Sequence, residues 1–528
     1  MSETKSILIN GRWRPADAEG TFMPKNPSTM KETGEEYPVS SMKDVEEALT
    51  VAAEAAEQMR SIPPKKRADF LELYADKIEA RREEIVAMTT IETALPIEPR
   101  LNSVELPRTT DQLRQAAKAV RDRSWALPTI DTSLNIRSMH GPLAGGVAVF
   151  GPNNFPLAFG SISGGDFAAA VAAGNPVIGK ANTSHPGTTR LLGEEALAAI
   201  QETGMPVGTV QLIYRTSHVT GEKLVSHPLI GATGYTGSRP AGLVLKAAAD
   251  QAGKPIYLEL SSVNPVFMLP GALKERLEEI ADEFLTSCLM GTGQFCTNPG
   301  IVVLLKDSGV SEFVACIKSK FTDAPVGTLL SEGVQSSLSQ SFTELQAAGA
   351  DLVVGGQRGG GKGFCCNNTL HRVSGRQFLE APDQLQQEAF GNSSLLVIVD
   401  DMAQAQAVTR TFEGNLTGTI YSAKDGSDDG LYNEIEPLLR TRVGRLLNDK
   451  MPTGVAVSPA MNHGGPYPAT GHPCFTAVGI PASMLRFSML QCYDNVRDHR
   501  LPPELRDKNP TGEVWRSIDG TWTQEDVG

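Results

Sequence analysis

Cysteine, positive charge and long apolar runs are all scarce in this sequence. Its 528 residues include 7 cysteines, an odd number without Cys-x-x-Cys spacing, so we expect free thiols in a reducing compartment. The net charge of −13 at pH 7 argues against a nucleic-acid partner or an anionic membrane surface. No apolar run approaches the roughly 18 residues of a membrane span, and the N-terminus lacks an apolar signal segment. These features predict a cytoplasmic protein without membrane insertion.

Several common catalytic motifs are missing as well. There is no Gly-x-Ser-x-Gly nucleophile motif, and no Gly-x-Gly-x-x-Gly fingerprint where strands and helices alternate. The histidines and cysteines between 463 and 474 lack zinc spacing, so no metal site is expected. "GNPVIGKA" at 174–181 has the P-loop spacing but ends in Ala181, and it has the pattern of a strand where a P-loop opens a helix. We therefore do not expect a P-loop nucleotide triphosphatase.

Two series of alternating strands and helices dominate the chain. Residues 44–125 carry apolar residues at helical spacing, and residues 127–142 alternate and are rich in turn formers, which predicts a β-ribbon. From "GGVAVFGP" to "KPIYLELS", short apolar strands alternate with helical segments such as residues 159–174, and a second series runs from "NPVFMLP" to "GTIYSA". The pattern predicts an α/β protein with two doubly wound lobes that meet near residue 260. The polar tail at 506–528 is expected to lie over another surface or to fray.

Three residue types in unusual surroundings are candidates for catalysis. Cys296 lies in "MGTGQFCTNPG", among small and polar residues, whereas an inert cysteine is usually buried among apolar ones. A polar, N–H-rich site favours the thiolate, so Cys296 is the best nucleophile in the chain. Glu259 interrupts the apolar strand "LELSSVNP" and is either a general base or a carboxylate paired with a lysine or a helix N-terminus. In "GPNNFPLAFG", Asn153 and Asn154 either cap a helix or donate to a developing oxyanion.

Two further segments are candidates for binding an anion. "TGSRPAG" at 236–242 ends a strand and opens a helix, whose free N–H groups suit a phosphate. Such glycine-rich turns are also common without a ligand. Lys180 ends the strand "NPVIGK" and, taken alone, has the pattern of a solvated strand-end lysine.

The order of these motifs is more specific than any one of them. "PNNFP", "GNPVIGK", "GYTGSRPAG", "LELSSVNP", "GQFCTNPG" and "QQEAFGN" follow one another as in the aldehyde dehydrogenase superfamily, and the sequence resembles that family over nearly its whole length. The resemblance implies NAD(P)-dependent oxidation of an aldehyde to an acid through a thiohemiacetal and a thioester. It also implies Cys296 as nucleophile, Glu259 as the base that activates water, and Asn154 as an oxyanion donor.

The resemblance assigns cofactor-binding positions as well. The family binds its nicotinamide dinucleotide on a variant Rossmann lobe, which accounts for the missing glycine fingerprint. The implied contacts are Lys180 to the adenosine ribose, Gly237, Ser238 and Gly242 to the diphosphate, and Glu388 and Phe390 to the nicotinamide ribose. Many members carry a Glu where this chain has Thr183, and a hydroxyl tolerates a 2′-phosphate that a carboxylate repels. With Arg215 as a charge partner, NADP is the expected cofactor and NAD the alternative.

The segment "AMNHGGPYPATG" departs from most of the family through His463. This variant, together with "GQFCTNPG" and the ending "SMLRFSMLQCYDNVRDHRLPPELR", resembles the subgroup of 2-oxoglutarate semialdehyde and bacterial long-chain aldehyde dehydrogenases. His463 is either a cofactor contact or a hydrogen-bonded loop histidine. We expect 2-oxoglutarate semialdehyde as substrate, with a long-chain aldehyde as the alternative. A short anionic substrate needs a cation in the pocket, for which Arg108 and Arg114 are candidates.

Two alternative functions are a catalytically idle binding protein and a CoA-acylating enzyme. The intact Cys296, Glu259 and Asn154 favour a hydrolytic dehydrogenase over both.

The resemblance also predicts how the chain is divided into domains and how it assembles. The ribbon is of the kind that the family uses to join a partner's sheet, so a homodimer or homotetramer is expected. The predicted parts are a cofactor-binding lobe (1–126 and 143–257), a catalytic lobe (258–474), and an oligomerisation arm with the C-terminal tail (127–142 and 475–528).

Overall fold

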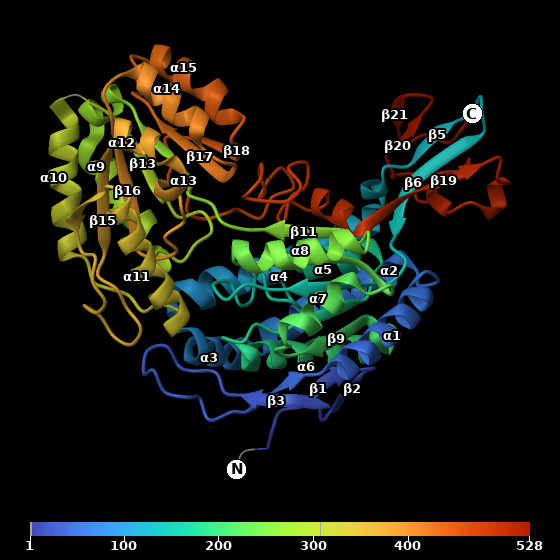
Figure 1. Ribbon diagram of the computed structural model, residues 1–528. Coiled ribbons are helices and arrows are strands. Elements are labelled where there is room, and N and C mark those ends of the chain that lie inside the picture. The colour runs from blue at the N-terminus through green and yellow to red at the C-terminus, as the bar shows by residue number, and fades with distance from the viewer. Residues whose placement is uncertain (1–2, 307) are drawn as a thin grey trace.

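Two α/β lobes and an arm of β-strands make up the computed structural model, which describes residues 3–306 and 308–528 (Figure 1). The lobe formed by the N-terminal half occupies the lower centre of Figure 1, the second lobe the upper left, and the arm the right. The predicted α/β class with two lobes and a ribbon is confirmed. In the described part of the chain, no helix is long and apolar enough to cross a membrane.

A seven-stranded sheet forms the centre of the first lobe. Its order is β11-β10-β7-β8-β9-β1-β2. The first five strands are parallel, and at one edge β1 pairs antiparallel with β9 and β2 pairs antiparallel with β1. The central strand β7 is buried along its whole length, as its sequence "GVAVF" predicts for a strand covered on both faces. The strands are β1 (Ile7–Ile9), β2 (Arg12–Arg14), β7 (Gly146–Phe150), β8 (Val177–Lys180), β9 (Val210–Ile213), β10 (Ile230–Thr236) and β11 (Ile256–Glu259).

Helices surround this sheet, and one of them is shorter than predicted. Only Gly165–Ala173 of the segment 159–174 is helical, because Gly164 packs so closely on Phe159 that a Cβ would lie 2.5 Å from its Cα. The preceding residues form turns instead. The helices are α1 (Met42–Met59), α2 (Pro64–Ala80), α3 (Arg82–Thr93), the π-helix η1 (Ile97–Glu105), α4 (Leu106–Asp122), α5 (Gly165–Ala173), α6 (Pro186–Thr203), η3 (Val207–Thr209), α7 (His218–Ser226) and α8 (Arg239–Gln251); a hairpin of β3 (Ala18–Phe22) and β4 (Tyr37–Ser40) lies beside them.

The carboxyl ends of the parallel strands lie level at one edge of the sheet. Phe150 pairs with Lys180, Lys180 with Ile213, and Thr236 with Glu259. Loops that follow these strands therefore emerge side by side. In open α/β sheets this edge is where ligands bind.

The second lobe contains another seven-stranded sheet, of order β14-β15-β16-β13-β12-β17-β18, in which only β14 is antiparallel to its neighbour among the described strands. Its strands are β12 (Val266–Met268), β13 (Ile301–Leu305), β14 (Asp351–Val354), β15 (Thr369–Ser374), β16 (Ser393–Val399), β17 (Asn415–Tyr421) and β18 (Val443–Asn448). Its helices are α9 (Pro270–Leu289), η4 (Met290–Gly293), α10 (Ser308–Asp323), α11 (Glu332–Ala347), α12 (Gly375–Glu380), α13 (Pro382–Leu385), α14 (Met402–Thr411) and α15 (Asp429–Arg440).

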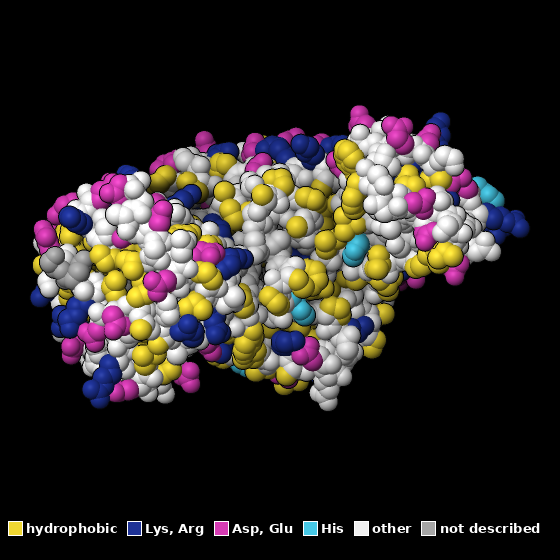
Figure 2. All heavy atoms as spheres, turned by 90° about the horizontal axis from the view of Figure 1, so that it is seen from above, with side chains coloured by type: hydrophobic (Ala, Val, Ile, Leu, Met, Phe, Trp, Pro, Cys, Tyr) yellow, Lys and Arg dark blue, Asp and Glu magenta, His cyan; other side chains and the backbone are white. Residues whose placement is uncertain are grey.

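The arm is a five-stranded sheet in which the ribbon and the C-terminal segment combine (Figure 1). The polar tail does not fray, because β20 pairs in parallel with β5 and β21 pairs with β20. The order is β19-β6-β5-β20-β21, and the elements are η2 (Ser124–Ala126), β5 (Thr129–Asp131), β6 (Ile136–Pro142), η5 (Ala482–Phe487), β19 (Ser488–Asp494), η6 (Asp498–Arg500), η7 (Pro503–Leu505), β20 (Arg516–Ile518) and β21 (Thr521–Thr523). Figure 2 shows acidic and basic side chains interspersed on the face seen from above.

Candidate active site

The loop that carries Cys296 joins η4 to β13 and is held by tight backbone packing. Gly293 has φ +69°, and a Cβ there would lie 2.1 Å from the carbonyl oxygen of Gly391, so glycine is required. The side-chain amide of Asn264 donates to the Cys296 carbonyl oxygen at 2.9 Å. These contacts fix the backbone of a thiol that remains partly exposed.

Cys296, Glu259 and His463 form a compact cluster. Glu259 ends β11, while His463 lies in the irregular segment after β18, and their ligand atoms and the Cys296 sulfur all lie within 4.8 Å of one another. The Nε2 of His463 is 2.8 Å from Glu259 Oε1 and 3.4 Å from Cys296 Sγ. While Glu259 is ionised, a proton has to lie between Nε2 of His463 and Oε1 of Glu259, because otherwise a lone pair on each atom would face the other. Nε2–H therefore donates to the carboxylate. In that arrangement the imidazole positions Glu259 and does not accept the thiol proton.

The remaining oxygen of Glu259 is free to act as a base. Glu259 is buried, and its Oε2 has no hydrogen-bond partner in the structure. Burial raises the pKa of Cys296 well above its usual value, the Glu259 charge raises it further, and the Arg108 charge lowers it. The resting thiol is therefore protonated at neutral pH, and its nearest carboxylate is placed to take the proton.

Asn154 approaches the thiol loop from the end of β7. Its amide Nδ2 donates to the Gln294 carbonyl oxygen at 2.9 Å, two residues before Cys296. An amide NH₂ carries two protons, so one N–H remains for an oxyanion on a substrate bound to the sulfur.

Aromatic side chains form the walls beside the cluster. Phe155 contacts Phe159 and Phe295 edge to face, with ring centroids 5.5 Å and 5.1 Å apart. Phe159 also lies 5.7 Å from the His463 ring. The guanidinium of Arg108 lies over this aromatic group, 5.1 Å from the Phe159 centroid. The walls next to Cys296 are thus apolar rings that also lie against two guanidinium groups, that of Arg108 and that of Arg100, which is 4.3 Å from the Phe155 centroid.

Two cations lie close together at the sheet edge where an adenosine ribose is expected. Burial and the charge of Arg215 lower the pKa of Lys180 to about 8. Arg215 follows β9, and in residues 3–306 and 308–528 neither cation forms an ion pair with a carboxylate. Thr183 lies in the turn that follows β8, three residues after Lys180. An anion between these groups would relieve their repulsion.

The turn between β10 and α8 has the form of a phosphate site. Ser238 is the N-cap residue of α8 but makes no side-chain cap, so the N–H groups of Arg239 and Ala241 are left uncapped; Pro240 has no N–H. A Cβ on Gly242 would lie 2.5 Å from Leu260, and Gly237 donates its N–H to the Glu259 carbonyl oxygen at 3.1 Å. The turn is therefore tied directly to the strand that carries the candidate base.

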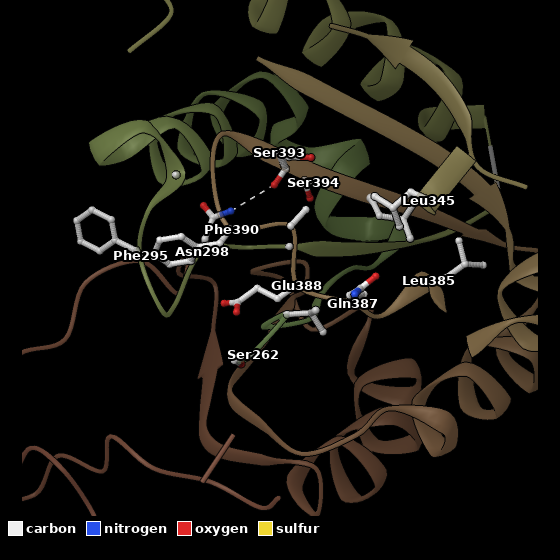
Figure 3. A pocket seen from close by; sticks show the side chains of 15 residues that line it. Ser262, Phe295, Asn298, Leu345, Leu385, Gln387, Glu388, Phe390, Ser393 and Ser394 are labelled. Carbon is white, nitrogen blue, oxygen red and sulfur yellow. Dashed lines mark hydrogen bonds between the residues drawn. The ribbon is translucent and has the colours of Figure 1, made fainter. Parts of the chain in front are cut away.

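A pocket contains the other predicted cofactor residues, and the empty space in and around it is about 390 Å³, including the solvent at its mouth (Figure 3). Glu388 and Phe390 line it together with Ser262, which follows β11. Phe295 and Asn298, which flank Cys296 in the thiol loop, line it as well. In Figure 3 the Glu388 side chain lies between Ser262 and Asn298. Burial raises the pKa of Glu388 to about 8, against hydrogen bonds from Ser262 N–H and the Ser261 hydroxyl that lower it. Glu388 is thus protonated at neutral pH and can donate as well as accept.

The structure therefore places Lys180 and Glu259 at one edge of the first sheet and brings Cys296 and His463 to Glu259, and comparison with known proteins identifies the family. A profile described as "Aldehyde dehydrogenase family" matches residues 13–436. The chain belongs to the aldehyde dehydrogenase family. It is 37% identical over 524 residues to alpha-ketoglutaric semialdehyde dehydrogenase 2 of Azospirillum brasilense, covering 97% of this chain and 98% of the relative.

Other aldehyde dehydrogenases agree with this assignment. Alpha-ketoglutaric semialdehyde dehydrogenase of Acinetobacter baylyi is 36% identical over 541 residues, covering 99% of this chain and all of the relative. The crystal structure of aldehyde dehydrogenase C from Pseudomonas syringae, a cysteine-to-alanine mutant in complex with NAD⁺ and octanal, superposes with a TM-score of 0.80 at 20% identity. That match covers 93% of this chain and 96% of the other. The protein is accordingly an NAD(P)-dependent aldehyde dehydrogenase.

One part of the site was not predicted from the sequence. Arg100, in η1, forms an ion pair with Glu105 and donates to the Asn154 carbonyl oxygen at 2.9 Å. Glu105 in turn accepts the backbone N–H groups of Leu157 and Ala158. This buried pair fixes the segment that carries Asn154. The pair and the backbone groups that it binds are about fifty residues apart in sequence, so no local pattern indicated the contact.

Proposed function

We propose that this aldehyde dehydrogenase oxidises 2-oxoglutarate semialdehyde to 2-oxoglutarate with NADP, through a thioester on Cys296. The observation that supports these roles is the cluster of Cys296, Glu259 and His463 beside the edge where the strands end. The open N-terminus of α8, the unpaired cations at the sheet edge and the cavity around Glu388 fit a nicotinamide dinucleotide. When bound, that cofactor supplies the hydride acceptor.

In the proposed mechanism, Glu259 Oε2 takes the proton of Cys296, and the thiolate attacks the aldehyde carbon. The carbonyl π pair moves to oxygen, and the second amide N–H of Asn154 donates to that oxyanion. The oxygen lone pair re-forms the carbonyl as the C–H bond breaks, which leaves a thioester. Glu259 releases the thiol proton to solvent and is a carboxylate again. It then takes a proton from water, hydroxide adds to the thioester, and the thiolate leaves as the acid forms. His463 holds Glu259 in reach of both proton donors; its predicted contact with the cofactor stays a prediction.

The names of the two relatives and the side chains of the pocket support the proposed substrate. Both relatives are named for the semialdehyde of alpha-ketoglutarate, which is 2-oxoglutarate. A cation beside the aromatic walls suits a short aldehyde with a distant carboxylate. A longer aliphatic aldehyde is the second candidate, because Phe155, Phe159 and Phe295 provide an apolar wall.

NADP is preferred over NAD because of the residues around the adenosine ribose. The hydroxyl of Thr183 donates to a 2′-phosphate, and Arg215 and Lys180 offer it positive charge. The lobe predicted as residues 1–126 and 143–257 then binds the cofactor, and the lobe predicted as 258–474 carries the nucleophile. The strand β11 extends the first sheet to Glu259, so the boundary between the lobes lies after that residue.

The arm, residues 127–142 with 475–528, is proposed to join two copies of the chain. Exposed apolar side chains gather on it, namely Leu134, Met489, Leu490, Trp515 and Trp522. A partner would cover them together with the unpaired edge of β19. Light scattering at micromolar concentration should show a dimer or tetramer, and a monomer would contradict this assignment.

The test of function combines a substrate screen with removal of the nucleophile. kcat/KM should be highest for 2-oxoglutarate semialdehyde with NADP, above decanal with either cofactor. Cys296→Ala should abolish oxidation and keep cofactor binding, because the hydride donor is the covalent adduct. Turnover in this variant, or a far higher kcat/KM for decanal, would overturn the proposal.

A further inference from the structure

Arg108 is a partly buried cation that has no ion-pair partner among the described residues. It is the third residue of α4, and its guanidinium lies 5.6 Å from the Phe155 centroid and 5.1 Å from that of Phe159. Its Nε and Nη2 are shielded from solvent, and neither has a hydrogen-bond partner in the part of the chain that the structure describes. Arg108 forms no ion pair within the described residues. Buried donors left unpaired are costly, and a guanidinium carries five of them in a planar fork.

The charges of two carboxylates, Glu105 and Glu259, act on Arg108, but among the described residues neither is hydrogen-bonded to it. Glu105 pairs with Arg100 and accepts two backbone N–H groups. Glu259 accepts from His463. The two negative charges are therefore held by other donors, and the Nε and Nη2 of Arg108 meet no acceptor among the described residues.

Two other arginines near the thiol differ from Arg108 in this respect. Arg100 is bonded to Glu105 and to a backbone carbonyl. Arg445, whose charge also interacts with Cys296, donates to the backbone carbonyl oxygens of residues 452 and 454. Arg108 alone among the three leaves two buried donors open in the described structure.

We propose that Arg108 binds the distal carboxylate of the substrate, so that the pocket selects short aldehydes that end in a carboxylate or a 2-oxo acid. This rests on the proposed function and names the group that recognises the substrate. In 2-oxoglutarate semialdehyde the aldehyde carbon and the carboxylate carbon are four bonds apart, about 5 Å when extended. The planar fork of an arginine matches a carboxylate in two parallel hydrogen bonds, while Phe155 and Phe159 pack on the methylene groups.

A second role for the same charge has to be separated from substrate binding. The pKa of Cys296 is lowered by the charge of Arg108, so Arg108 also stabilises the thiolate. A loss of that effect would slow the oxidation of every aldehyde and shift the pH profile. A loss of carboxylate binding would affect only the charged substrate, and mainly through KM.

The experiment compares Arg108→Gln with Arg114→Gln, on the semialdehyde and on pentanal. Arg114 is a matched control, because it lies on the same helix but forms ion pairs with Asp76 and Glu79 at the surface. Arg108→Gln should lower kcat/KM for 2-oxoglutarate semialdehyde by about 100-fold, the loss expected for a buried charged hydrogen bond, and leave pentanal within about threefold. Arg108→Lys should recover part of the loss, and Arg114→Gln should change neither.

The outcomes separate this inference from the function itself. Equal losses for both aldehydes with a shifted pH profile would assign Arg108 to thiolate stabilisation, and an unchanged kcat/KM for the semialdehyde would also overturn carboxylate binding. A wild-type enzyme that prefers pentanal or decanal would instead overturn the proposed substrate. Retained pentanal oxidation shows that the variant is folded. If Arg108→Gln is inactive on both, Arg108→Lys decides: it must discriminate against the semialdehyde relative to pentanal, or the inference is wrong.

Discussion

Replacing Glu259 by Gln should make Cys296 more acidic while it slows turnover. The carboxylate and the sulfur lie within 4.8 Å, and the Glu259 charge raises the pKa of the thiol. At that separation two unit charges repel by about 3 kcal/mol at an effective dielectric constant of 20. That energy corresponds to roughly 2 pKa units, and solvent at the partly exposed thiol reduces the expected change to about 1 unit or more.

The assay is the pH dependence of alkylation by iodoacetamide without cofactor. Only the thiolate reacts, so the rate at Cys296, followed by peptide mass spectrometry, reports its pKa. The midpoint should fall in Glu259→Gln, so that labelling near neutral pH becomes faster. Steady-state oxidation should become slower, with a burst of hydride transfer, because the base for thioester hydrolysis is gone.

Glu388→Gln provides the control for this prediction. The pKa of Glu388 is about 8, so the wild-type group is uncharged below that pH and its replacement should leave the lower part of the profile unchanged. A midpoint for Glu259→Gln equal to or above that of the wild type would refute the electrostatic reasoning. Unchanged steady-state turnover without a burst would place the base elsewhere.

Three further predictions concern the cofactor, the thiol loop and acid stability. Thr183→Glu should lower kcat/KM for NADP by repelling its 2′-phosphate and spare NAD; a native preference for NAD would contradict this. Gly293→Ala should lower kcat by about tenfold or more and reduce Tm, because the new Cβ meets the Gly391 carbonyl oxygen at 2.1 Å. Gly349→Ala is its control, since φ there is also positive but the nearest atom is 3.7 Å away; equal losses in both would exclude the clash. Burial lowers the pKa of His371 to about 4, so the unfolded state takes up a proton first as pH falls from 6.5, and stability should fall between these values. In His371→Gln, urea unfolding should show a smaller loss over that range, and an equal loss would assign it to other groups.

The elements of the fold were largely predictable, because each short strand and helix carries its own periodicity. The error at residues 159–164 has a physical cause, since small residues there satisfy helix and turn patterns equally. Close backbone packing between Gly164 and Phe159 decides between helix and turn, and the local sequence pattern does not show that packing. The tail was expected to lie over another surface or to fray, and its strands were missed for a similar reason: β20 is ordered by pairing with β5, nearly four hundred residues earlier, and β21 by pairing with β20.

The candidate site was predictable where a motif and the strand order coincide. Lys180 and Glu259 end parallel strands, so the alternating pattern already places them at one edge. His463 lies on a long irregular segment, and Arg108 lies on the helix α4. The distance of each from Cys296 depends on how the two lobes pack. Their residue types made them candidates, but only the three-dimensional contacts separate Arg108 from Arg114.

The connection between the lobes bears on how the enzyme loses activity on heating. Glu259 ends the last strand of the first sheet, and the next strand along the chain, β12, already belongs to the second, which also anchors the Cys296 loop. A small rotation of one lobe on the other therefore separates base from nucleophile before either sheet is disrupted. Thermal inactivation should precede the loss of far-ultraviolet circular dichroism, and a ligand that bridges the lobes should bring the two temperatures together.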